Sequence, residues 1–193
     1  MEYVKVGDTD IRVSKLCVGC MSFGKAGTMH DWTLDEKQSE KLVNKALELG
    51  INFFDTANCY SLGTSEEYLG RAIRKYAKRE EVVLASKVYF NEGRLSKQAI
   101  RREIDGTLKR LGTDYLDLYI IHRFDYETPV EETMEALDSL VKDGKVRALG
   151  ASAMYGYQFY NMQMAAEKNG FTKFSAMENH YNLLYREDER ELI

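Results

Sequence analysis

The sequence lacks the features that mark membrane, secreted and nucleic-acid-binding proteins. No stretch approaches the roughly 20 consecutive apolar residues that span a bilayer. The first ten residues, MEYVKVGDTD, mix charged and apolar side chains and lack the apolar run of a signal peptide. The net charge is −4, with 27 Lys and Arg against 31 Asp and Glu, so no basic excess is available to follow a phosphate backbone. We therefore expect neither nucleic acid nor a membrane as a partner.

Cysteine is also scarce. Three cysteines, an odd number, do not suit a disulfide framework and fit a reducing compartment, so we expect a cytoplasmic protein. Cys17 and Cys20 form a single C-x-x-C pair, and no second Cys/His pair stands at ligand spacing. We interpret the two as small side chains packed near a first strand, with zinc or redox use as the alternative. No metal is expected.

What is present is the composition of an ordinary globular domain, with 193 residues, 44% hydrophobic and 30% charged. Short β-branched or aromatic runs alternate with longer helical segments along the whole chain. Several of the short runs are almost continuously apolar, which is typical of parallel strands buried on both faces. The expected strands are Leu16–Val18, Asn52–Phe54, Val82–Ala85, Leu116–Ile121, Val146–Leu149 and Phe174–Met177.

The helical segments carry their own start and stop signals. Thr33 with Glu36, and Thr64 with Glu67, have the spacing of capping boxes. Ser96 is expected to begin the third helix, and Thr128 to cap the fourth. Glycines end the helices. The glycines expected to follow the first, third, fourth and fifth helices are Gly50, Gly112, Gly144 and Gly170. The fifth helix is expected at Tyr157–Lys168, and the sequence is helical again at Glu187–Leu192.

Strands that alternate with helices predict an α/β fold with a parallel sheet. An open Rossmann sheet would need a G-x-G-x-x-G turn, which is absent, so a closed (β/α)8 TIM barrel is favoured. Such a barrel takes about 250 residues, and only six of its eight strands can be counted here. We therefore expect residues 1–193 to form a single barrel domain that lacks its C-terminal part. The short polar stretch between Phe90 and Ser96 suggests that a loop is missing there too.

Barrel enzymes place their chemistry at the C-terminal ends of the strands. Those positions hold Asp55, Lys87 and His122 after three consecutive strands, with Tyr60 in the loop that follows Asp55. Further along the chain they hold Ser152, and then Glu178 with Asn179.

This set of side chains suits proton transfer by a tyrosine. A phenol has a pKa near 10 and is a poor proton shuttle at neutral pH unless its anion is stabilised. The Lys87 ammonium can supply that stabilisation, and Asp55 can hold the lysine charged and in place. His122 can donate to a carbonyl oxygen or orient a substrate. No side chain can provide the hydride that must accompany such a proton, so a cofactor is implied.

The segments GINFFDTANCYSLGTSEEYLGRAI, VVLASKVYF and LDLYIIHRFD resemble the aldo-keto reductase superfamily. The resemblance is strongest to its bacterial and potassium-channel β-subunit-like branch, and LCVGCMSFG, GKVRALGAS and ENHYNLLYRE extend it over essentially the whole chain. It implies an eight-stranded barrel and a catalytic tetrad of Asp55, Tyr60, Lys87 and His122. It also implies NADPH (NADP+ when oxidised), bound without a Rossmann turn.

The resemblance further implies where the cofactor lies. Gly19 and Met21 would line the nicotinamide end, with Ser152 and Glu178 near the carboxamide and Asp55 beside them. Two positions depart from the family pattern. Ala153 stands where Asn is usual, and Glu178 stands where Gln is usual and cannot donate to the carboxamide oxygen. The groups that grip the adenosine phosphate would come from strands beyond residue 193.

The expected activity is reduction of an aldehyde or ketone to an alcohol, with a small carbonyl compound as substrate. Trp32 and Phe124 are candidate substrate-lining aromatics beside Tyr60 and His122, and ordinary packing is the equal alternative. A channel β-subunit-like regulatory protein with little turnover is a second interpretation, and a Schiff-base lyase using Lys87 is a third. The sequence leaves the physiological substrate and any homo-oligomeric assembly open.

Overall fold

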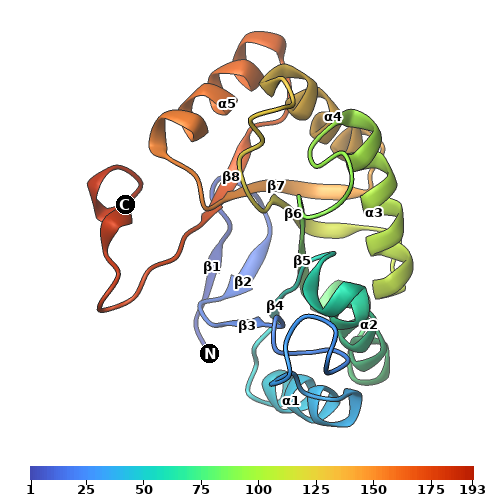
Figure 1. Ribbon diagram of the computed structural model, residues 1–193. Coiled ribbons are helices and arrows are strands. Elements are labelled where there is room, and N and C mark those ends of the chain that lie inside the picture. Colours follow the sequence, from blue (N-terminus) through green and yellow to red (C-terminus); the bar gives the residue numbers. More distant parts are fainter.

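The computed structural model describes residues 1–193 and contains one curved parallel sheet with helices along its outer face (Figure 1). Six strands lie in chain order, and each is parallel to its neighbours. This is an incomplete (β/α)8 barrel, as the alternating pattern predicts. The strands are β3 (Cys17–Gly19), β4 (Phe53–Asp55), β5 (Val83–Val88), β6 (Leu116–Ile121), β7 (Val146–Ser152) and β8 (Phe174–Glu178).

Five helices connect the strands and cover the convex side of the sheet. Side chains alternate between two cores because successive residues of a strand point to opposite faces. Tyr119 and Ile121 of β6 are fully buried beneath the helices. Leu118 and Ile120 of the same strand line the concave interior. None of the helices has the length and apolar content needed to cross a bilayer. They are α1 (Glu36–Glu48), α2 (Thr64–Tyr76), α3 (Lys97–Leu111), α4 (Val130–Lys142) and α5 (Gly156–Asn169).

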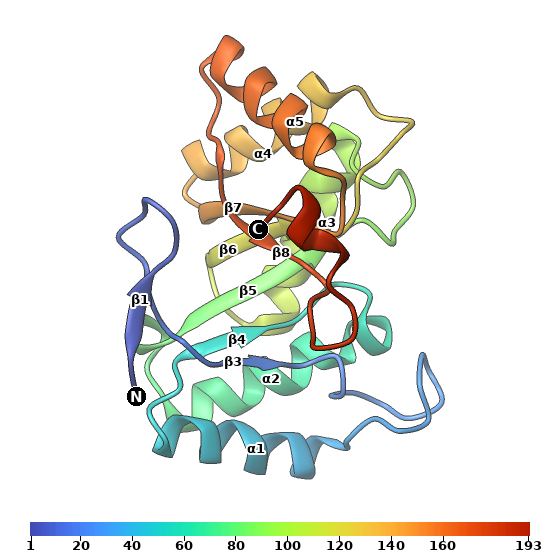
Figure 2. The same cartoon turned by 90° about the vertical axis from the view of Figure 1, so that its left-hand side faces the viewer.

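An N-terminal hairpin, absent from the sequence-based expectations, lies at the end of the barrel interior where the strands begin. Its strands β1 (Tyr3–Lys5) and β2 (Arg12–Ser14) are antiparallel. Figure 2 shows the hairpin and the long loop after β3 at opposite ends of the strands. Asn52 ties the hairpin to the sheet, since its side chain accepts from the Ser14 backbone at 2.7 Å and donates to the Arg12 carbonyl at 3.0 Å.

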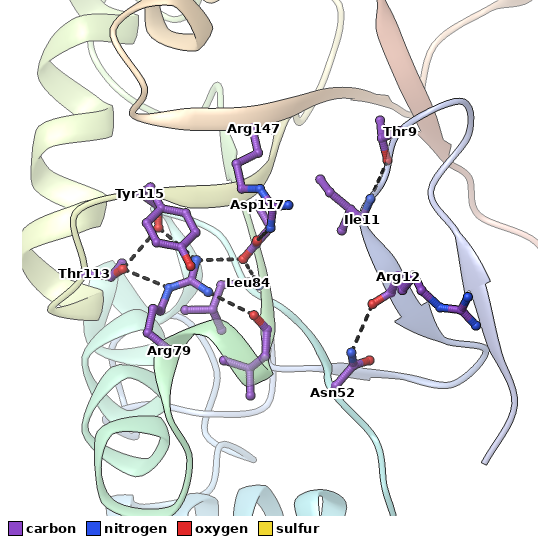
Figure 3. Close-up of polar contacts among 11 residues, drawn as sticks. Thr9, Ile11, Arg12, Asn52, Arg79, Leu84, Thr113, Tyr115, Asp117 and Arg147 are labelled. Carbon is purple, nitrogen blue, oxygen red and sulfur yellow. Dashed lines mark hydrogen bonds and ion pairs between the residues drawn. The ribbon is translucent and has the colours of Figure 1, made fainter.

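A buried carboxylate stabilises the same end of the sheet. Figure 3 shows Asp117 of β6 between the guanidinium groups of Arg79 and Arg147. Each guanidinium donates to it at 2.6 Å, and the backbone N–H of Leu84 donates at 3.0 Å. Arg79 also stacks on the ring of Tyr115, 4.0 Å from its centroid. A fully buried charge requires such partners, so this cluster joins three strand starts as one unit.

Most expected helix ends are confirmed, and three expected starts are wrong. Ser96 caps α3 through the backbone N–H of Ala99, and Gly112 and Gly170 end α3 and α5 in the left-handed conformation. The capping box at α1 is Asp35 with Gln38, not Thr33 with Glu36.

The other two errors also involve threonines. Helix α2 is preceded by Gly63, and the Thr64 hydroxyl donates to the Ser61 carbonyl instead of capping. Helix α4 is preceded by Pro129, because the Thr128 hydroxyl donates to Asp125. The segment expected to be helical at the end of the chain forms only a short 3-10 helix, Glu187–Arg190.

Candidate active site

The C-terminal ends of the strands bring the predicted polar residues to one mouth. Gly19 and Asp55 are the last residues of β3 and β4 and are paired in register. Lys87 is the penultimate residue of β5, and His122 follows β6 directly. Ser152 and Glu178 end β7 and β8, again in register with each other. Because the strands are parallel, a pattern of strand-terminal residues becomes a ring of side chains.

Lys87 is the centre of this ring. Its side chain is 1% exposed, which requires that its ammonium group be paired and hydrogen-bonded. The ammonium contacts the Asp55 carboxylate and donates to the Thr56 carbonyl at 3.1 Å. It also donates to the hydroxyl oxygen of Tyr60 at 3.4 Å. The amine therefore contacts both the phenol and the acid.

The loop that carries Tyr60 is held at several points. Backbone N–H groups of Thr56 and Asn58 donate to the carbonyls of Ala85 and Lys87, at 3.0 and 3.1 Å, so the loop continues the edge of β5. After Tyr60 the chain turns through Ser61 and Leu62, both with positive φ (47° and 54°). Two successive non-glycine residues in the left-handed region are strained, and such strain persists only where the surroundings enforce it.

Asn58 is a further anchor that the sequence interpretation did not single out. Its side-chain amide donates to Glu103 of α3 at 2.9 Å and to the side chain of Asn91 at 3.1 Å. Asn58 itself is buried. Helix α3 thereby fixes the loop two residues before Tyr60. The sequence shows that Asn58 lies between Asp55 and Tyr60, but it gives no sign of the contact with Glu103, 45 residues away.

The His122 ring packs against the ring of Tyr60. The two rings meet edge to face, 5.7 Å between centroids, and Phe90 packs on His122 in the same manner at 5.0 Å. Burial, together with the positive charges of Lys87 and Arg123, lowers the pKa of His122 to about 3. The imidazole is therefore neutral at physiological pH and can offer one N–H to an oxygen atom.

Burial and the neighbouring charges together set the pKa values of Asp55, Lys87 and Tyr60. Burial raises the pKa of Asp55 to about 7, against the attraction of Lys87 and with the help of Glu178. Burial would lower the pKa of Lys87, but the charges of Asp55, Glu178 and Tyr60 outweigh it and the pKa is raised. The pKa of Tyr60 is raised by burial, while the Lys87 ammonium lowers it. Lys87 is thus the group that favours a tyrosinate.

Two cavities open at or beside this mouth. The first, of about 580 Å³, runs through the concave interior and is lined by Gly19, Asp55 and Glu178 near the mouth and by the N-terminal hairpin at the other end. The second, of about 840 Å³, is lined by loops after β5, β6 and β7 and by the C-terminal segment. Its aromatic walls are Tyr89, Phe90, Phe124, Tyr126, Tyr155, His180 and Tyr185.

The remaining candidate residues divide between these cavities and the surface. Phe124 lines the aromatic cavity, whereas Trp32 lines neither cavity, is 56% exposed and stacks on His30. Met21 is 41% exposed in the loop after β3. Cys20 is buried and Cys17 is exposed, both as free thiols. The structure brings no three His, Cys, Asp or Glu side chains together as a metal site.

The first cavity fits the nicotinamide end of a cofactor. Oδ1 of Asp55 and Oδ1 of Asn179 are buried without a hydrogen-bond partner, so both can accept from a bound polar group. A Cβ built on Gly19 would meet nothing within 4 Å, which leaves open space beside Asp55. Asp55 and Gly19 are among the residues that the resemblance expects at the cofactor, whereas Asn179 was not assigned to it and lies outside the lining of this cavity.

Comparison with known proteins supports a single family. The family model described as Aldo/keto reductase family matches residues 15–193. A protein of Schizosaccharomyces pombe named "Putative aryl-alcohol dehydrogenase C977.14c" is 43% identical over 99% of this chain and 62% of its own length. Aldo-keto reductase AMT2 of Alternaria alternata is 42% identical over 99% and 60%. Versiconal hemiacetal acetate reductase of Aspergillus parasiticus is 41% identical over 100% and 63%.

The solved structures agree with the sequence relatives. The thermostable aldo-keto reductase Tm1743, solved with the inhibitor epalrestat, superposes with a TM-score of 0.83 at 31% identity, covering 99% of this chain and 66% of the other. The named sequence relatives are fungal, so they give no support to the bacterial and channel-subunit branch expected from the sequence.

The chain spans about three fifths of the length of these curated relatives. The alignment with the Schizosaccharomyces pombe protein has 220 positions, more than the 193 residues of this chain. The relative therefore also carries residues within the matched span that have no counterpart here.

Proposed function

Because this chain belongs to the aldo/keto reductase family, we propose that it is an NADPH-dependent reductase of small aldehydes and ketones in which Tyr60 donates the proton. One observation carries the proposal: the buried Lys87 ammonium contacts both the Asp55 carboxylate and the Tyr60 hydroxyl. That arrangement makes a phenol able to give up its proton at a defined point in space.

Each member of the tetrad has a distinct role. Tyr60 gives its proton to the carbonyl oxygen, and Lys87 stabilises the tyrosinate that remains. Asp55 keeps the lysine charged and oriented. His122, neutral because burial lowers its pKa to about 3, donates a hydrogen bond to the same carbonyl oxygen and directs it toward Tyr60. These fixed dipoles and charges act without reorganising as charge develops on the oxygen.

Residues at and beside the first cavity would hold the cofactor. Gly19 ends β3 and lines this cavity, whereas Met21, in the loop after β3, lies outside its lining. Asp55, Ser152 and Glu178 are the strand-terminal polar groups that would bind its carboxamide end. Bound NADPH supplies the hydride that no side chain can provide. Oδ1 of Asp55, which is buried without a hydrogen-bond partner, is the acceptor that would gain most from the carboxamide N–H.

The substrate that fits the second cavity is an aromatic carbonyl compound. Its aromatic walls suit a planar ring by stacking and edge contacts, and one relative carries aryl-alcohol dehydrogenase in its name. Phe124 is the candidate substrate-lining residue there, and Phe90 connects the cavity to His122. Trp32, exposed in the loop after β3, remains a candidate only if that loop folds over the mouth.

A Schiff-base mechanism at Lys87 is disfavoured. A lysine must lose its proton to attack a carbonyl, and the charges around Lys87 raise its pKa. The amine is therefore held in the form that cannot react.

The proposal is tested by turnover with a panel of benzaldehydes and aliphatic aldehydes, using NADPH and NADH in parallel. We expect consumption of NADPH with an equal amount of alcohol formed, and lower KM for the aromatic members. Absence of any alcohol product with either cofactor, from a chain whose circular dichroism shows the fold intact, would contradict it.

A further inference from the structure

Glu178 places a second carboxylate on Lys87. We propose that Glu178 is a positioning residue, which acts through Lys87 to set the pH at which Tyr60 exchanges its proton. The effect on catalysis rests on the proposed function. The electrostatic coupling among Glu178, Lys87 and Tyr60 does not, and it can be measured without any substrate.

The distances from the Lys87 ammonium to its oxygen neighbours are the first support. The ammonium has three N–H donors but four oxygen neighbours. It contacts the Asp55 carboxylate and lies 3.1 Å from the Thr56 carbonyl. The Tyr60 hydroxyl and Oε1 of Glu178 both lie at 3.4 Å. Asp55, Thr56 and Tyr60 accept the three N–H groups, so Glu178 pairs with the ammonium by charge alone, without a hydrogen bond.

The second support is that Glu178 has no other partner. Its carboxylate makes no hydrogen bond and no ion pair except the one with Lys87. It reaches Lys87 from β8, three strands away from β5, across the concave side of the sheet. The side chain is 44% exposed at the rim of the first cavity. Lys87 is therefore the only polar partner of the Glu178 side chain, whereas Lys87 also contacts Asp55, Thr56 and Tyr60.

Titratable side chains surround Lys87 from several elements of the mouth, and only two of them are charged. Asp55 from β4 and Glu178 from β8 are acidic, while Tyr60 and His122 are neutral at physiological pH. The Cys17 thiol on β3 lines the first cavity, which is open to solvent, with these groups. Partial desolvation inside that cavity and the charges of Asp55 and Glu178 raise its pKa to about 12, so it too is neutral. With both carboxylates ionised the group carries one net negative charge, which opposes formation of a tyrosinate.

The sign of the effect follows from this balance. The Glu178 charge raises the pKa of Tyr60, of Asp55 and of Lys87. Removing that charge, as in Glu178→Gln, leaves the Lys87 ammonium to Asp55 and Tyr60 and removes a repulsion from the anion of each. The pKa of Tyr60 and that of Asp55 then fall. The tyrosinate fraction at a fixed pH then rises.

The test begins without cofactor or substrate. Carbon-13 NMR of the chain labelled at aspartate Cγ and tyrosine Cζ follows both titrations, assigned with Asp55→Asn and Tyr60→Phe. We expect Glu178→Gln to lower the Asp55 midpoint by about one pH unit and to lower the Tyr60 midpoint by less, since Glu178 is the weakest of the charges that act on Tyr60. Glu80→Gln is the matched control, since it removes the same charge from an exposed site before β5.

Equal Asp55 midpoints in Glu178→Gln and Glu80→Gln would overturn the inference. Glu178→Asp keeps the charge but shortens its reach, so an intermediate midpoint is expected. If Glu178→Gln fails to fold, an Asp55 midpoint in Glu178→Asp equal to that of the parent chain overturns the inference instead.

Turnover gives the second readout. The pH profile of kcat for carbonyl reduction should shift to lower pH in Glu178→Gln, because a more acidic Tyr60 loses its proton earlier. A shifted NMR midpoint in a chain that reduces no carbonyl compound supports the coupling and overturns the reductase proposal. An unshifted midpoint in an active chain overturns the role of Glu178 alone.

Discussion

The Nζ atom of Lys87 lies 3.4 Å from the hydroxyl oxygen of Tyr60, although the two residues come from different βα units. Lys87 is fixed by its strand, with its backbone carbonyl accepting from the Asn58 N–H. Tyr60 is fixed by the loop that this same hydrogen bond holds. The contact between the two side chains is thus a consequence of the backbone pairing at the ends of β4 and β5.

The Asp55–Lys87 pair is expected to be strongly coupled in stability. Asp55→Asn leaves the buried ammonium with only the partly exposed Glu178 carboxylate, and Lys87→Met leaves the Asp55 carboxylate without its cation, so each should cost about 3 kcal/mol. The double variant should cost much less than the sum, because the one charge that remains, on Glu178, is partly exposed to solvent. Urea unfolding of the four chains measures this, and additive costs would contradict the pairing.

Asn58 is expected to affect the rate more than binding. Asn58→Ala removes the contacts to Glu103 and Asn91 and loosens the loop two residues before Tyr60. A misplacement near 1 Å can cost about 100-fold in rate, so kcat should fall by about ten- to a hundredfold with KM changed little. Asn44→Ala serves as the control, since this half-buried asparagine of α1 hydrogen-bonds through its side chain only to Glu48. Steady-state kinetics that show a change confined to KM would argue against this anchor.

Asp117 is expected to matter for stability and not for the active site. Asp117→Ala leaves Arg79 and Arg147 without their shared carboxylate and the Leu84 N–H without its acceptor. We expect a loss of about 3 kcal/mol in the free energy of unfolding, since Arg147 is half exposed and can be solvated. The Asp55 titration should be unchanged. A loss below about 1 kcal/mol, typical of surface pairs, would contradict the assigned role.

His122 predicts part of the acid dependence of stability. Its pKa is lowered in the folded chain to about 3, from the ordinary 6.5. The unfolded chain therefore binds a proton that the folded chain does not, and stability falls as pH decreases from 6.5 toward 3. His122→Asn should flatten that decline. Urea midpoints at pH 7 and pH 5, compared between the two chains, measure it, and an identical pH dependence would show that His122 is not held neutral.

The fold and the tetrad positions could be predicted from the sequence because both depend on local patterns. Continuous apolar runs such as Leu116–Ile121 define buried strands, and parallel strands force their C-terminal residues together. That is sufficient to bring Asp55, Lys87 and His122 to one mouth, although their catalytic roles stay predictions.

Other features depended on contacts that no local pattern records. The N-terminal hairpin has strands of three residues with charged ends, too short for a clear alternation. The Glu103–Asn58 contact joins residues 45 positions apart. The approach of Glu178 to Lys87 arises from the curvature of six strands, which the sequence pattern does not specify. The helix starts at Thr64 and Thr128 were mistaken because a threonine hydroxyl can also bind within its own turn.

The most direct test of the central claim compares kcat for aromatic aldehyde reduction between this chain and Tyr60→Phe. The variant lacks only the hydroxyl group, so NADPH binding, measured by fluorescence titration, should be retained. A positioned general acid contributes about 100- to 10,000-fold, and we predict a loss of kcat in that range. A Tyr60→Phe chain that turns over at the normal rate would show that the proton comes from elsewhere and would contradict the account.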